Sequence, residues 1–250
     1  MIRNLIPMPS FRPAIGLVVL PLTIPVAYLL YLDRAVKRHC KTATGIRNGK
    51  KGIVSLPANV RRPVTLPQGI EAEDSKWVLA CERVISEPLH TSSLSYNLKT
   101  DLSSAMTDYV RATMTAFSWT PQAFILRASA GDEEVKKTFD TQYIQMLEFR
   151  NDDRVNGFWR VVYRDDGRVE MALDAPAAYK GPVVKGVIVT GIEEQCDGNV
   201  VFINETWMWR KQDEVPLLLE RRIAQWLHVV LSGWLVMKGV RAVAERKKCA

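Results

Sequence analysis

The feature that most constrains this chain is an apolar run close to its start. Residues 13–32 read PAIGLVVLPLTIPVAYLLYL and contain no charged side chain. At ~1.5 Å rise per residue, a helix of this length crosses the hydrocarbon core of a bilayer. Tyr28 and Tyr31 lie at one end, where such rings favour the membrane interface. The sequence therefore predicts a transmembrane helix over residues 13–32, preceded by a short tail over residues 1–12.

A cleaved signal peptide is the alternative to this retained helix. The run ends in YLLYLDR, which lacks the pattern of small residues that signal peptidase requires. Two basic residues, Arg3 and Arg12, precede the run, and seven follow it within twenty positions. By the positive-inside rule, we expect a single-pass protein with its C-terminal domain on the cytosolic side. The membrane we expect is that of the endoplasmic reticulum.

The positive charge of the chain is concentrated beside this segment. Nine of the 34 lysines and arginines lie within residues 33–62, against one acidic residue, Asp33, whereas the rest of the C-terminal part is slightly acidic. Glycine and proline recur over residues 33–70, which predicts a basic linker. Such a basic collar suits anionic membrane lipid, and nucleic acid would require a basic face on the folded domain. We therefore expect membrane lipid as a partner and no nucleic acid.

The remaining residues, 71–250, predict one soluble α+β domain. Residues 74–86 suit a short helix or a strand, and residues 100–118 repeat apolar positions at helical spacing. Asp165-Asp166-Gly167 and the segment 195–199 are typical of hairpin turns. Five antiparallel strands are expected in sequence order, which makes a meander: residues 143–149, 158–164, 168–174, 183–192 and 200–210.

The last segment, residues 215–244, predicts a long C-terminal helix. Residues 223–237 carry no formal charge, but fifteen residues are few for a membrane span. We expect this helix to pack across the concave face of the sheet, with a second membrane span as the alternative. The order of elements resembles that of the helix-grip proteins, which hold lipids or polyketides, and is similar to the cone-shaped cyclase and dehydratase folds.

Catalytic and metal-binding signatures are missing from the sequence. It contains no GxSxG elbow, no GxGxxG after a strand and no CxxCH, and no histidine pair has metal-ligand spacing. The four cysteines lack CxxC spacing, which favours free thiols in a cytosolic domain. The sequence therefore predicts neither a cofactor nor a bound metal.

Polar side chains within apolar strands are the candidate site residues, because burying them costs free energy unless they are paired. Arg160 and Glu170 could be neighbours across the first hairpin, and either a raised carboxylate pKa or a solvated ion pair fits that arrangement. Tyr163 is expected to share a strand face with Trp159. The candidates for catalysis are Glu170, Arg160, Tyr163 and the mid-helix His228; those for substrate binding are Trp159, Trp207 and Asn204, with Glu205 beside them.

Asn204-Glu205-Thr206 is also a glycosylation sequon, which makes Asn204 the acceptor if the domain is lumenal instead of cytosolic.

In overall layout the chain resembles the small membrane-anchored tailoring proteins of fungal natural-product pathways. This resemblance implies a cofactor-free cyclase, isomerase, lyase or pericyclase-type enzyme that acts on a hydrophobic terpenoid or polyketide intermediate, with other membrane-bound pathway enzymes as partners. Two alternatives remain: a membrane-tethered lipid-binding or carrier domain, and a non-enzymatic membrane assembly protein.

Overall fold

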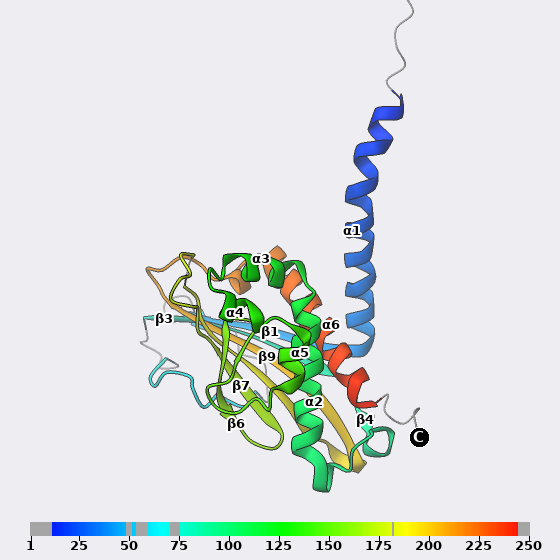
Figure 1. The fold of residues 1–250 in the computed structure, drawn as a ribbon, viewed down its shortest axis with the longest axis vertical. Helices are drawn as coiled ribbons and strands as arrows, with labels where there is room; N and C mark the ends of the chain where they lie inside the picture. Colours follow the sequence, from blue (N-terminus) through cyan, green and yellow to red (C-terminus); the bar gives the residue numbers. More distant parts are fainter. Residues whose placement is uncertain (1–11, 49–51, 54–59, 71–75, 182, 245–250) are drawn as a thin grey trace, which may run out of the picture.

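The computed structural model describes residues 12–48, 52–53, 60–70, 76–181 and 183–244, and shows an α+β protein. A curved antiparallel sheet runs in the order β2-β1-β3-β9-β8-β7-β6-β5, with β4 paired to β9 (Figure 1). The strands are β1 (Cys40–Asn48), β2 (Gly52–Ile53), β3 (Trp77–Ser86), β4 (Leu89–His90), β5 (Arg154–Val155), β6 (Trp159–Arg164), β7 (Arg168–Leu173), β8 (Lys185–Glu194) and β9 (Asn199–Lys211).

Two long helices, α2 (Leu98–Ser118) and α6 (Arg222–Ala244), pack against each other, and α6 also contacts β3 and β9. The helix α1 (Arg12–His39) runs alongside α6, and its N-terminal part extends past the end of the domain where α3 lies (Figure 1). Shorter helices complete the fold: α3 (Pro121–Ser129), α4 (Glu133–Lys137), α5 (Thr141–Met146), and the 3-10 turns η1 (Thr91–Ser93), η2 (Cys196–Gly198) and η3 (Leu218–Glu220).

Both faces of the sheet are covered. On the helix side, Val84, Met171 and Phe202 pack with side chains of α2 and α6 in the main core. On the opposite side, residues 60–70 form a strap, whose Leu66 and Ile70 pack over Leu79, Val189 and Trp207. We call the two faces the helix side and the strap side.

The meander predicted from the hairpin turns is confirmed from β6 to β9. At the tip of the β8–β9 hairpin, Asp197 and Gly198 adopt φ values of 62° and 71°, in the left-handed region. The β6–β7 turn is closed differently, since the backbone N–H of Gly167 donates to Asp165 Oδ1 at 3.0 Å and Gly167 is not left-handed. The segment Asp165-Asp166-Gly167 therefore makes a tight turn through a side-chain hydrogen bond from its first residue.

The strand predicted over residues 143–149 is wrong, because residues 143–146 belong to the helix α5 and residues 147–149 are not in a strand. Ile144 and Leu147 are both buried, and positions three residues apart lie on the same face of a helical turn. Tyr143 donates from its hydroxyl to the carbonyl of Arg154 at 3.0 Å, which fixes α5 beside β5.

The linker predicted over residues 33–70 is corrected in part. α1 continues directly into β1, which pairs with β3 along its whole length, from Cys40 opposite Ser86 to Asn48 opposite Val78. Its residues 41–44 are all exposed, so this strand has no apolar alternation to reveal it. Its place depends on backbone pairing with β3.

Among the described residues, α6 is the one helix whose length and composition could span a membrane. Its apolar side chains are also required by the fold, because Val230, Val236 and Val243 are buried against neighbouring elements. The predicted packing of the C-terminal helix on the sheet is therefore observed. Residues 13–32 are helical within α1, and their insertion into a membrane remains a prediction.

We predict that Gly239→Ala destabilises the fold by about 1–3 kcal/mol through overpacking. A Cβ at Gly239 would lie 2.4 Å from two ring atoms of Tyr109, which is fully buried. Without that ring, the change would favour the helix by about 0.5–1 kcal/mol. Urea unfolding of the purified protein measures the effect, and the loss should shrink in a Tyr109→Leu background. An equal loss in both backgrounds would contradict this packing.

Candidate functional site

The predicted aromatic site residues lie on opposite faces of the sheet. Trp159 belongs to the core on the helix side, and Trp207 to the core on the strap side. A β-bulge between Val161 and Tyr163 then turns Tyr163 to the strap side, opposite Glu170. The prediction that Trp159 and Tyr163 share a face is therefore wrong, and these rings do not line one cavity.

The expected pairing of Arg160 with Glu170 is also wrong. Arg160 lies opposite Ala172 in the register, and its guanidinium binds Asp174 at 3.0 Å and Asp152 at 3.0 Å. Hydrogen bonds to Asp152 and Asp174 raise the pKa of Arg160. Its side chain is 41% exposed, so Arg160 is a surface ion-pair residue in this fold.

Glu170 is buried on the strap side, where its carboxylate accepts hydrogen bonds from a nearby residue of its own strand and from the strap. It accepts from Arg168 Nε at 2.9 Å, from the backbone N–H of Val64 at 3.0 and 3.1 Å, and from Thr65 Oγ1 at 3.3 Å. Val64 and Thr65 belong to the strap. Glu170 therefore fastens residues 60–70 to the sheet.

Glu205 is the centre of a second buried polar cluster on the strap side. It pairs with Arg83 and accepts from the indole of Trp207 at 3.1 Å, while Arg83 also binds Glu193 at 2.8 Å. Burial raises the pKa of Glu205, and the Trp207 hydrogen bond and the charge of Arg83 oppose that rise. These ion pairs and the indole hydrogen bond join the side chains of neighbouring strands to one another, so the cluster has a structural role.

Asn204 lies on the helix side of β9, between Val84 and Thr190 of the adjoining strands. It is 4% exposed, so a glycan on this side chain could not be accommodated in the folded domain. The sequon is therefore sterically closed in this fold.

His228 has chemical partners that the sequence did not reveal. Its Nδ1 lies 2.9 Å from Glu82 Oε1 and 3.3 Å from Ser232 Oγ, and the side chain is 22% exposed. Glu82 projects from β3 on the helix side and is buried. Among the described residues, its Oε2 has no hydrogen-bond partner. A carboxylate that orients a half-buried imidazole is an arrangement suited to general acid–base chemistry.

An apolar groove lies where α1, α6 and the α2–α3 corner meet. It holds about 400 Å³, and most of its lining is apolar. α1 contributes Pro25, Tyr28, Leu29 and Leu32; residues 119–122 form the corner; and α6 contributes Leu227, Val230, Leu231 and Trp234. We call this the α1–α6 groove.

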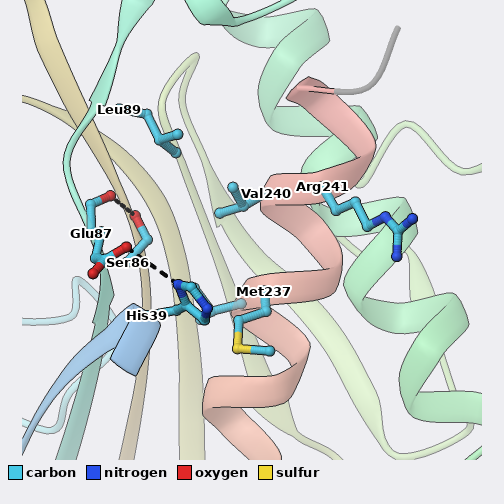
Figure 2. Close-up of a pocket in the computed structure, with 8 residues that line it drawn as sticks. His39, Ser86, Glu87, Leu89, Met237, Val240 and Arg241 are labelled. Carbon is cyan, nitrogen blue, oxygen red and sulfur yellow. Dashed lines mark hydrogen bonds and ion pairs between the residues drawn. The ribbon is translucent and has the colours of Figure 1, made fainter. Parts of the chain in front are cut away.

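A second pocket, of about 250 Å³, lies at the other end of α6 (Figure 2). Met237 and Val240 project into it from α6, and Leu89 faces them from β4. His39 Nδ1 and Glu87 Oε2 lie 3.3 Å apart at its rim, and both side chains are more than half exposed. A surface pair of this kind contributes little stability.

The described part of the chain contains no group of three histidine, cysteine or acidic residues that could hold a metal ion. Cys40 and Cys81 are buried free thiols, and Cys196 is an exposed one. Burial raises the pKa of Cys40 to about 12, so its thiolate, the nucleophilic form, is scarce at neutral pH.

Comparison with known proteins gives no function for the chain. No family model, no curated protein and no solved structure matches it. The choice between functions therefore depends on the groove, the His228–Glu82 pair and the covered sheet.

We predict that Glu170→Ala lowers the free energy of unfolding by about 3–5 kcal/mol, because it leaves the buried Arg168 guanidinium without its carboxylate partner. Arg160→Ala is the matched control, since its ion pairs are partly solvated and worth about 1 kcal/mol or less. Urea denaturation of both variants checks this. Equal losses would contradict the structural role given to Glu170.

Proposed function

We propose that this chain is a membrane-tethered protein that binds a hydrophobic small molecule in the α1–α6 groove. The observation that carries the proposal is that one wall of this groove comes from residues 25–32, inside the segment proposed to span the membrane. The groove is therefore shared between anchor and domain. A ligand that partitions into lipid could enter it without crossing water.

The size and lining of the groove support a small apolar ligand. Ligand pockets commonly hold about 300–1,000 Å³ and bury most of their ligand against apolar and aromatic side chains. The α1–α6 groove holds about 400 Å³, with Tyr28, Trp119 and Trp234 as its rings. Gln122 adds a polar group, which could fix the orientation of a hydroxyl or carbonyl. A terpenoid or polyketide intermediate, or a lipid chain, has the right chemistry.

The proposal predicts that a hydrophobic compound copurifies with the full-length chain from membranes, and that Leu227→Trp removes most of it. Leu227 lines the groove and is 40% exposed, so a larger ring there fills the space without disturbing a buried core. Mass spectrometry of organic extracts from equal amounts of protein measures the bound compound.

The matched control is Ile223→Trp, one turn earlier on α6. Ile223 is 75% exposed and is not part of the groove lining. This variant should retain its compound at the level of the unchanged protein. The proposal fails if the unchanged protein carries no specific compound, or if the Leu227→Trp and Ile223→Trp variants lose the compound equally.

The second candidate function is a cofactor-free enzyme of the cyclase, isomerase or lyase type, as the resemblance in layout implies. The specific observation in its favour is the Glu82–His228 pair. Glu82 Oε1 lies 2.9 Å from the imidazole Nδ1 of His228 and so orients the ring, and a histidine positioned by a carboxylate is a common general acid or base. In this reading His228 is the acid or base and Glu82 positions it.

A His228→Gln variant separates the enzyme from the carrier. Glutamine can still hydrogen-bond Glu82 but cannot serve as a proton carrier at neutral pH. The enzyme reading predicts that the compound bound to the variant differs by mass or by retention from that bound to the unchanged protein, because substrate replaces product. The same compound in both, at equal occupancy, would contradict a chemical role for His228 and favour the carrier.

A further inference from the structure

Large apolar side chains are exposed together at one end of the domain. Ile125 on α3 is 70% exposed and Ile223 at the start of α6 is 75% exposed. Neither side chain is part of a buried hydrophobic cluster, so the packing of the fold does not explain why these two residues are apolar. We call this surface the apolar end, and its members are Trp119, Phe124, Ile125, Leu218, Ile223 and Leu227.

We propose that the apolar end lies against the surface of the lipid bilayer that α1 enters. α3 and the beginning of α6 lie at the end of the domain beyond which the N-terminal part of α1 extends (Figure 1). If α1 spans the bilayer, the surface beside its point of entry is the one held against lipid. This inference rests on the proposed function only for the role of α1 as anchor.

The chemistry of the apolar end suits the membrane interface. Trp119 has a ring with an apolar body and a polar N–H, the kind of side chain that is enriched at the interface. Tyr28 and Tyr31 of α1, which are 54% and 66% exposed, supply rings of the same kind. Together they form an interfacial belt that includes both anchor and domain.

Charge at the rim of this surface favours anionic lipid. Arg221 and Arg222 are both exposed, and they come directly before Ile223. Basic residues next to exposed aliphatic and aromatic side chains are typical of surfaces that bind the cytosolic leaflet, where phosphatidylserine is negatively charged.

The α1–α6 groove opens beside the apolar end. Trp119 and Leu227 belong both to the apolar end and to the groove lining. When the apolar end rests on the bilayer, the groove is continuous with the lipid phase. A hydrophobic ligand then reaches it by lateral diffusion within the membrane.

The test places an environment-sensitive fluorophore at two sites of the full-length chain in vesicles of phosphatidylcholine and phosphatidylserine. One probe is attached through Ile125→Cys, with Cys196→Ser and Cys249→Ser. The control probe is attached to the native Cys196, with Cys249→Ser; Cys196 is exposed at the tip of the β8–β9 hairpin, at the opposite end of the domain (Figure 1). Cys40 and Cys81 are buried, so both labels go to single sites.

The inference predicts a blue-shifted emission at position 125 and severalfold stronger quenching by nitroxide lipids than at position 196. An aqueous quencher should show the reverse order. The inference is overturned if both probes are equally accessible to water. It is also overturned if position 125 is shielded from water without being quenched by lipid, because a protein partner would then cover it.

Extraction of the same vesicles with carbonate separates the two proposals. A chain that washes off has no membrane anchor, which overturns the proposed function and the docking together. A chain that stays, with a water-accessible probe at position 125, overturns the docking alone. A further probe is attached through Leu218→Cys. In a membrane-bound variant that also carries Ile125→Glu and Ile223→Glu, this probe should be more accessible to water than in the chain without these two changes.

Discussion

The close packing of α1 on α6 is the contact on which the rest of the structure depends. A Cβ at Gly233 would lie 2.4 Å from Val36 Cγ1, so only glycine lets the two helices approach this closely. Beside it, the indole of Trp226 donates to Asp33 Oδ1 at 2.8 Å. Because α1 continues without a break into β1, this packing ties the direction of the N-terminal helix to that of the sheet.

The second constraint is that both faces of the sheet are covered, which decides what its polar residues do. A strand buried on both sides has no solvent to hydrate a carboxylate or a guanidinium, so each must be paired within the protein. Glu170 fastens the strap, and Arg83 pairs with Glu205. Glu170 and Arg168 hold the strap on the sheet, and the space for a ligand lies at the helices.

The sequence predicted the meander because its signals are local: turn residues and alternating side chains suffice for β6 to β9. The sequence did not predict β1, because its residues 41–44 are all exposed and the strand is defined by its pairing with β3. The bulge after Val161 reversed the face of Tyr163, since one extra residue shifts every later side chain. The sequence did not indicate Glu82 of β3 as a site residue, because its partner His228 lies 146 residues away along the chain.

The most direct test of this account is the distance distribution between nitroxides at Leu30 on α1 and Ile125 on α3, measured by double electron–electron resonance. The full-length chain would be placed in vesicles, with Cys196 and Cys249 replaced by serine. Packing of α1 against α6 predicts one narrow distribution, because the helix and the domain move as one body. A broad distribution, as a flexible linker after α1 would give, would contradict the shared groove and the orientation derived from it.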